Sequence, residues 1–168
     1  MDTDIRYEIP GDVADIHRLI ELAFRNAPHT DHTEQYIVQA LRAAGALWAS
    51  LVAESGGKLV GHVALSPVQI SDAAPGWYGL GPISVHPDYQ GKAVGSRLMQ
   101  CALAELEARG AAGCVLLGDP GYYGRFGFKA QSRLVLPGVP SEYFLARSFG
   151  GAIPQGSVQY HLAFTARD

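Results

Sequence analysis

The chain has 168 residues, a net charge of −3, 48% hydrophobic residues and 17% charged residues. This composition is too apolar for a disordered chain, and the length fits a single domain spanning residues 1–168. Because the chain is slightly acidic and has no long basic run, it is not expected to bind nucleic acid. The N-terminus lacks a signal-peptide pattern and no apolar run has membrane-spanning length, so a cytoplasmic protein with no membrane partner is expected.

The first third of the chain predicts a strand and two helices. The alternation in Ile5–Ile9 is typical of a half-buried strand that ends before Pro10. Asp12 is expected to cap the helix that follows, whose apolar positions recur at helical spacing. Thr33 is expected to cap the second helix, which Gly45 ends.

The middle of the chain is rich in strand-forming residues. Two such runs, 47–54 and 58–70, flank Ser55-Gly56-Gly57, which predicts a hairpin of antiparallel strands. The run 77–85 predicts a fourth strand, and Gly81-Pro82 within it predicts a bulge or a break in the hydrogen-bond ladder.

The remaining chain predicts a helix over about 94–109 and a buried strand over 114–118. A short helix opening into a strand near Phe128 follows, and two further strands are expected in 141–149 and 157–164. This order of elements predicts a mixed α/β domain with helices flanking the sheet. Cys101 and Cys114 fall in helix and strand patterns, where free buried thiols in a reducing cytoplasm are expected.

The segment Tyr89–Gln100, YQGKAVGSRLMQ, places small residues where a helix begins. A helix start presents unpaired N–H groups that favour anions, and small residues allow a ligand to approach the backbone. A P-loop is excluded because no glycine stands upstream at the required spacing, and a dinucleotide fingerprint fits poorly. The pattern therefore predicts a pyrophosphate site of another kind.

Two motifs give the chain its resemblance to a known family. The segment ISVHPDYQGKAVGSRLM resembles the acyl-CoA signature of the GNAT acetyltransferase superfamily, and YYGRFGF, residues 122–128, resembles a second motif of that family. The resemblance implies a mostly antiparallel central sheet whose fourth and fifth strands splay apart, with acetyl-CoA as co-substrate. One position departs from the pattern, since Ala93 stands where the family usually has glycine, and a positive φ there would put coenzyme binding in doubt.

The resemblance also implies roles for individual residues. Pantetheine would pair with the backbone of the fourth strand, and the pyrophosphate would rest on the helix start, with two aromatic residues of the second motif close to the coenzyme. The implied coenzyme-binding residues are Ile83, Ser84, Val85, Gln90, Gly91, Lys92, Ala93, Val94, Gly95, Ser96, Tyr122 and Phe126.

Tyr123 matches the tyrosine of the family that protonates the sulfur of coenzyme A, and it is the expected catalytic residue. The sequence does not identify the general base, because the fourth strand carries no carboxylate. Asp31, Glu34, Asp119 and water remain open candidates for that role.

The histidines predict no metal site. His29, Asp31 and His32 lie close in sequence but have no further convincing ligand, so no metal is expected. His62 lies among apolar strand residues, where a hydrogen-bonded core imidazole is expected.

The sequence thus supports an N-acetyltransferase that moves an acetyl group from acetyl-CoA to a primary amine by direct attack. The acceptor, a small molecule or a peptide, stays unidentified. The alternative is a non-catalytic acyl-CoA-binding regulatory domain, suggested by Ala93 and the missing strand carboxylate. A monomer and a homodimer are both compatible with the sequence.

Overall fold

The computed structural model describes residues 2–168, and its backbone contacts divide the chain into two compact units. The first unit contains the residues up to Leu65, Gly81–Ala102, and those from Leu162 onward. The second contains Ser66–Leu80 and Leu103–His161. A single domain over residues 1–168 stays a prediction.

The first unit is built on antiparallel strands. β1 (Asp4–Tyr7), β2 (Ala49–Ser55) and β3 (Lys58–Pro67) pair in sequence order, and β5 (Trp77–Val85) follows β3. Between β2 and β3, Gly56 and Gly57 have φ angles of +58° and +79°. Two consecutive residues with positive φ are what a tight two-residue hairpin turn requires, so the predicted hairpin is confirmed.

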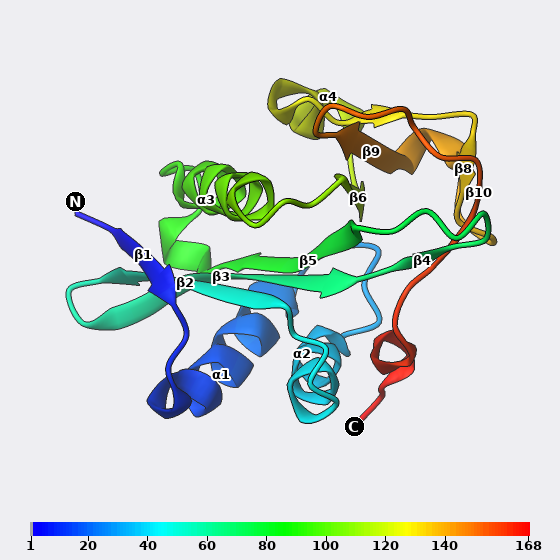
Figure 1. The fold of residues 1–168 in the computed structure, drawn as a ribbon. Helices are drawn as coiled ribbons and strands as arrows, with labels where there is room; N and C mark the ends of the chain where they lie inside the picture. Colours follow the sequence, from blue (N-terminus) through cyan, green and yellow to red (C-terminus); the bar gives the residue numbers. More distant parts are fainter. Residues whose placement is uncertain (1) are drawn as a thin grey trace. The chain divides into compact units, whose positions relative to one another are not determined.

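Helices cover both faces of this part of the sheet. α1 (Val13–Phe24) and α2 (Glu34–Ala43) lie on one side of β1–β3 (Figure 1). Their apolar faces pack on the sheet in a buried cluster of Ile16, Ile20, Val38, Val52 and Ala64. The first turns of α3 (Val94–Ala108) pack at Gly61, where an added Cβ would lie only 2.8–2.9 Å from the Leu98 and Val94 side chains. The absent side chain at residue 61 thus sets how closely α3 approaches β3.

The second unit contains most of the remaining strands. β6 (Gly113–Leu117) pairs in parallel with Trp77–Gly79 of β5, and β9 (Phe144–Ser148) pairs antiparallel with both β6 and β7 (Lys129–Ala130). A small separate sheet joins β4 (Gln69–Ile70), β10 (Gly156–Gln159) and β8 (Leu134–Val135).

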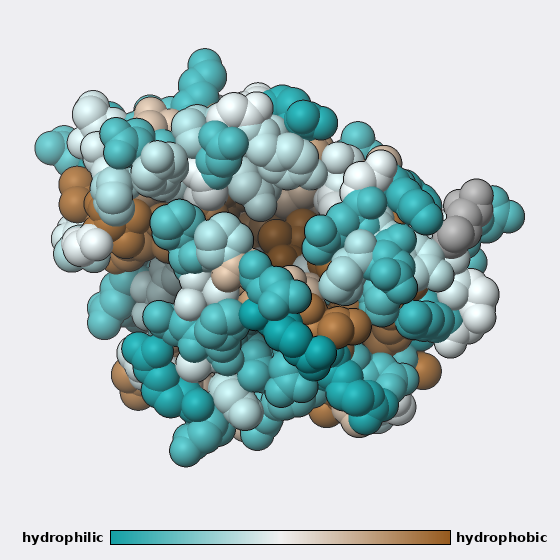
Figure 2. Space-filling model, turned by 180° about the vertical axis from the view of Figure 1, so that it is seen from behind, coloured by the Kyte–Doolittle hydropathy of each residue, from teal (hydrophilic) through white to brown (hydrophobic). Residues whose placement is uncertain are grey.

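Short helices complete the chain. α4 (Pro120–Tyr123) is followed by a 3₁₀ turn at Gly124–Phe126, and other 3₁₀ turns lie at Pro10–Asp12, Pro87–Tyr89, Ser141–Tyr143 and Leu162–Thr165. None of the helices described in residues 2–168 is long and apolar enough to cross a membrane. On the face seen in Figure 2, hydrophobic residues surface only in separate areas among hydrophilic ones.

The predicted mixed α/β class with a mostly antiparallel sheet is confirmed. The predicted fourth and fifth strands are β5 and β6, and their pairing ends at Gly79 and Val115. The sequence predicted a bulge or a break at Gly81-Pro82, but β5 has no break there and runs from Trp77 to Val85 with a cis peptide bond at Gly81-Pro82.

Several details of the prediction are wrong. The strand expected over 157–164 ends at Gln159, because Leu162–Thr165 coil into a 3₁₀ turn whose Ala163 packs against α2. The run 58–70 is two strands in different sheets, and the first strand ends at Tyr7. Neither Asp12 nor Thr33 caps its helix through its side chain, although both stand at the N-cap.

Asp12 has other partners instead. Its carboxylate accepts the Ile9 N–H at 2.8 Å and pairs with Arg6 at 2.8 Å, while Arg6 also reaches Glu54 of β2 at 2.9 Å. The ion pair with Arg6 holds the pKa of Asp12 below its usual range. Of the two free cysteines, Cys114 is buried as predicted and Cys101 is half-buried.

Candidate active site

The predicted pyrophosphate site lies in the first unit, where a loop leads into α3. Residues 90–93 are exposed, Gly95 and Ser96 are half-buried, and Val94 is buried as the first residue of α3. The side chain of Gln90 donates a hydrogen bond to the Val85 carbonyl at 3.2 Å and so ties the loop to the end of β5. The first N–H groups of an α-helix have no partner within the helix, so this end of α3 is suited to an anion.

The backbone of this loop is left-handed at two positions. Gly91 has a φ of +76° and Ala93 a φ of +66°. The first costs little because glycine has no Cβ, whereas an L-residue in this conformation costs roughly 1–2 kcal/mol. The loop thus adopts at Ala93 a conformation suited to glycine although the residue is alanine. A positive φ at Ala93 is the condition under which the sequence put coenzyme binding in doubt, and the structure has this positive φ.

Lys92 projects from the same loop and lies over an aromatic ring. Its Nζ is 5.5 Å from the centre of the Tyr89 ring, and the Nζ of Lys58 is 5.9 Å from the same ring. His86 lies just after β5, and its Nδ1 accepts the Asp88 N–H at 3.1 Å. Two cations therefore stand close to the start of α3, which favours an anionic ligand there.

The strand segment predicted to pair with pantetheine is Ile83–Val85 at the end of β5. Ile83 and Val85 are half-buried, and Ser84 is 2% exposed. Among the described residues, no hydrogen-bond partner contacts the buried Ser84 Oγ. The cost of leaving this hydroxyl unpaired makes it a candidate contact for a bound molecule.

The second motif forms an aromatic cluster in the second unit. The Tyr122 ring packs edge-on against Tyr123 at 4.8 Å and against Phe126 at 5.6 Å between ring centres. Arg125 lies over the Tyr122 ring at 4.7 Å. Burial, followed by the neighbouring Tyr122, raises the pKa of the Tyr123 phenol. The phenol therefore stays protonated through the neutral range and is able to donate a proton.

Tyr123 is fitted closely to the turn before it. A Cβ added to Gly118 would lie 2.3 Å from Cε2 of Tyr123, which is far inside contact distance. Asp119, the N-cap of α4, accepts the Gly121 N–H at 2.9 Å. Glycine at 118 and the cap at 119 together fix where the Tyr123 ring lies.

The three carboxylates left open as bases have different surroundings. Asp119 caps α4, and the exposed Asp31 pairs with Arg167 at 3.4 Å. Glu34 accepts a hydrogen bond from Thr30 Oγ1 through Oε2, while its Oε1 is buried without a partner among the described residues. Glu34 is thus the candidate with a free buried oxygen. Within residues 2–168 no cluster of three or more metal-ligating side chains forms, at His29–His32 or elsewhere.

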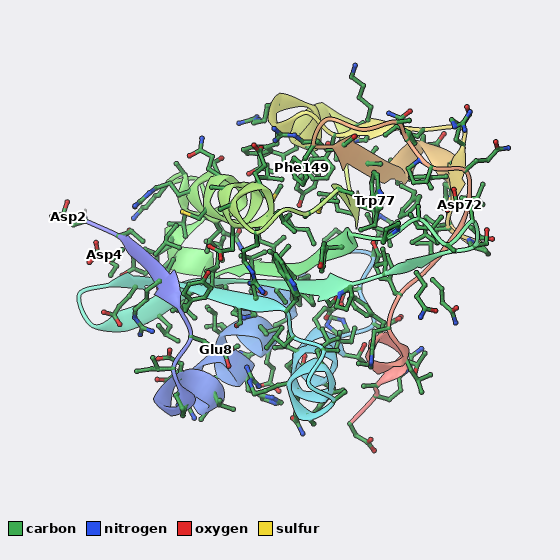
Figure 3. The ribbon with its side chains drawn as sticks, viewed as in Figure 1. Asp2, Asp4, Glu8, Asp72, Trp77 and Phe149 are labelled. Carbon is green, nitrogen blue, oxygen red and sulfur yellow. The ribbon has the colours of Figure 1, made fainter. Side chains whose placement is uncertain are left out.

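His62 lies in the core of the first unit and is fully buried. Its Nε2 lies 2.8 Å from Ser50 Oγ, which confirms the predicted hydrogen-bonded imidazole. Ser50 donates to Glu8, which follows β1 (Figure 3), and Glu8 pairs with Arg42 of α2 at 2.8 Å. The sequence does not predict this network, because its four residues come from four separate segments of the chain.

Burial lowers the pKa of His62 to about 4, an effect that nearby Glu8 opposes and Arg42 reinforces. Burial alone would raise the pKa of Glu8, but its hydrogen bonds from Arg42 and Ser50 hold it below its usual value. The network therefore combines a neutral imidazole with an ionised carboxylate near neutral pH.

Comparison with known proteins shows what this chain is similar to. Residues 13–128 match the model of the Acetyltransferase (GNAT) family. The chain is 34% identical over 167 residues to the uncharacterized N-acetyltransferase YhbS of Escherichia coli K12, covering 95% of this chain and 97% of YhbS.

Solved structures agree with this match. A GNAT family acetyltransferase from Brucella melitensis, in complex with acetyl-CoA, is 50% identical with a TM-score of 0.87, covering 97% of this chain and 98% of the other. YhbS from Escherichia coli in complex with CoA is 32% identical with a TM-score of 0.83, covering 96% and 91% respectively. The chain belongs to the GNAT acetyltransferase family.

Proposed function

We propose that this protein is an acetyl-CoA-dependent acyltransferase that acetylates a primary amine. The observation that carries the proposal is the likeness, at 50% identity over nearly the whole of both chains, to a GNAT acetyltransferase crystallised with acetyl-CoA. The family to which the chain belongs is one of acetyltransferases, which supports the same reaction class.

The proposed coenzyme site uses the residues that the sequence singled out. The pyrophosphate would accept hydrogen bonds from the N–H groups of Gly91–Ser96, with Lys92 as a neighbouring charge. Pantetheine would pair with the backbone of Ile83, Ser84 and Val85, a segment whose pairing with β6 has already ended at Gly79. Tyr122 and Phe126 would pack against the coenzyme as part of the aromatic cluster.

When bound, acetyl-CoA would supply a thioester carbonyl for an amine to attack directly. Tyr123 would donate its phenolic proton to the departing sulfur, and its buried, protonated state supports that role. The amine must lose a proton before it attacks, and Glu34 is the proposed acceptor of that proton because its Oε1 is buried and free of partners among the described residues. We also propose that the protein is cytoplasmic and that it is either a monomer or a homodimer.

The test begins with calorimetric titration of the purified protein with acetyl-CoA and, separately, with coenzyme A. Saturable binding of both, weakened by Gly95→Trp, is expected. A panel of primary amines is then assayed for release of the free thiol of coenzyme A. Binding without turnover of any amine would refute the enzyme and leave an acyl-CoA-binding protein, and absence of binding would refute both.

A further inference from the structure

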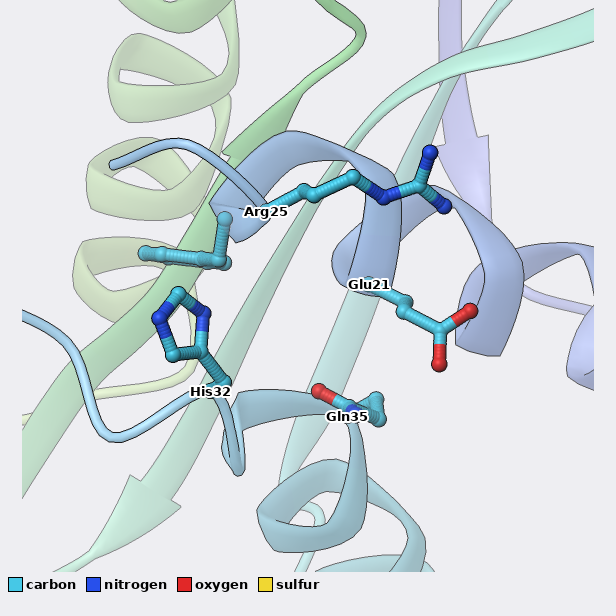
Figure 4. A pocket seen from close by; sticks show the side chains of 5 residues that line it. Glu21, Arg25, His32 and Gln35 are labelled. Atoms are coloured by element: carbon cyan, nitrogen blue, oxygen red, sulfur yellow. The ribbon is translucent and has the colours of Figure 1, made fainter.

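A pocket of the first unit lies outside every segment assigned to the coenzyme. It has a volume of about 480 Å³ and is lined by Glu21, Phe24, Arg25, His32 and Gln35 (Figure 4). These residues come from the last turn of α1, the residue just after it, the loop that follows, and the first turn of α2. The volume is within the range of small-molecule sites.

Gln35 is the buried polar group of this pocket. The residue is only 5% exposed, and no hydrogen bond of its side-chain amide is found among the described residues, but the amide atoms themselves are not fully shut off from solvent. Figure 4 shows it between His32 and Glu21. Because the protein does not use the hydrogen bonds of this amide, a donor and an acceptor in the pocket wall are open to a ligand.

The charges around Gln35 are of both signs and are not paired with each other. Glu21 and Arg25 are four residues apart on the same face, a spacing at which a glutamate and a cation often pair on a helix. The ion pairs and hydrogen bonds described for the chain nevertheless include neither side chain. An open carboxylate and an open guanidinium therefore line one pocket.

The start of α2 adds positive potential to one side of the pocket. Thr33 makes no side-chain cap, and the first N–H groups of α2, at Glu34 and Gln35, have no partner within the helix. These groups carry the positive end of the helix dipole and favour an anion. The Glu34 carboxylate opposes this, but one of its oxygens is held by Thr30 and the other is buried.

We propose that this pocket binds a small zwitterion, an amine that also carries a carboxylate, as the acceptor of the acyl transfer. The carboxylate would pair with Arg25 and accept hydrogen bonds at the start of α2, and the Gln35 amide would bond to either group. The ammonium would first lie against Glu21 and would then lose its proton to Glu34, the proposed base, before it attacks. The inference names a substrate class and in that respect rests on the proposed function.

The first experiment tests the pocket without any turnover. Saturation-transfer NMR is recorded with the amino acids methionine, phenylalanine and lysine, and with the three amines that lack only their carboxylates. The amino acids are expected to bind and the decarboxylated amines to bind about tenfold or more weakly. Equal binding within each pair, or no binding of any amino acid, would overturn the inference whether or not acetyl-CoA binds.

The second experiment compares Arg25→Gln with Arg18→Gln. Arg18 is an exposed arginine of the same helix that pairs with Asp15 and lies outside the pocket, so it is the matched control. Arg25→Gln is expected to remove the preference for the carboxylate, and Arg18→Gln to keep it. An Arg25→Gln protein that keeps the wild-type preference, with an unchanged circular dichroism spectrum, would overturn the assignment of Arg25.

The two proposals fail in different ways. If acetyl-CoA binds and decarboxylated amines are acetylated as fast as their amino acid partners, the acyl transfer stands and the zwitterion site falls. If amino acids bind in an Arg25-dependent manner but no amine is acetylated, the site stands as a zwitterion pocket and its role as an acceptor site falls.

Discussion

The buried imidazole of His62 gives the chain a pH-dependent stability that is open to measurement. Its pKa falls from an ordinary value of 6.5 to about 4 in the folded protein, because burial disfavours the charged ring. The unfolded chain therefore binds a proton that the folded chain rejects between these values. Stability is fully present above about pH 6.5 and is lost as the pH falls toward 4.

The magnitude follows from the size of the shift. Lowering a pKa from 6.5 to about 4 corresponds to about 3 kcal/mol between the two limits. Over the window from about pH 8 to about pH 5, the loss is about 2 kcal/mol. Glu8 and Asp12, whose pKa values are lowered, contribute stability that is lost only below the ordinary carboxylate range. The stability lost between about pH 8 and about pH 5 therefore measures the contribution of the His62 imidazole.

The assay is urea unfolding followed by circular dichroism at several pH values. Wild-type protein is expected to lose about 2 kcal/mol of unfolding free energy from about pH 8 to about pH 5, whereas His62→Gln, which does not titrate, is expected to lose much less. His29→Gln, in an exposed loop, controls for removal of an imidazole that is not in the core. A wild-type curve that is flat over this window, or a His62→Gln protein with the wild-type slope, would refute the reasoning.

Three further substitutions test the site and its supports. Tyr123→Phe is expected to leave acetyl-CoA affinity within about threefold and to slow acetylation about 10²- to 10⁴-fold, measured by calorimetry and thiol release. Ala93→Gly is expected to raise the unfolding free energy by about 1 kcal/mol, because glycine adopts the left-handed conformation at φ +66° without the cost that alanine has; an unchanged urea midpoint would contradict this. Gly113→Ala is expected to destabilise the fold by about 3 kcal/mol or more, because its Cβ would lie 2.3 Å from the Trp77 ring. Gly151→Ala, at a position with open space around it, is the neutral control. A small effect of Gly113→Ala in thermal unfolding would be inconsistent with that packing.

Periodicity and turn chemistry predicted most elements of the fold. The Gly56-Gly57 hairpin and the helix that starts at Val94 are local features, and local rules were sufficient for them. The strand expected through Leu162 failed because apolar residues at that spacing also fit a 3₁₀ turn, and the packing of Ala163 against α2 decides between the two. That contact joins residues more than a hundred positions apart, which no local pattern encodes.

The sequence identifies only part of the candidate site. Residues 90–96 and Tyr123 stand in motifs that are contiguous in sequence, so the sequence alone identifies them as candidates. The pocket at Gln35 was missed, because a glutamine at the start of a helix looks like an ordinary surface residue. Its burial becomes visible only when α1 and α2 are placed together.

Ala93 and Gly118 show that two positions with small residues can have different physical requirements. At position 93 the requirement is conformational: the backbone is left-handed, and alanine meets it at a cost that glycine would avoid. At position 118 the requirement is steric: no positive φ is involved, but the Tyr123 ring occupies the space of a side chain. The first tolerates a methyl group with a loss of stability, whereas the second would displace the proposed proton donor. Substitution of the two positions should therefore separate an effect on folding free energy from an effect on catalysis.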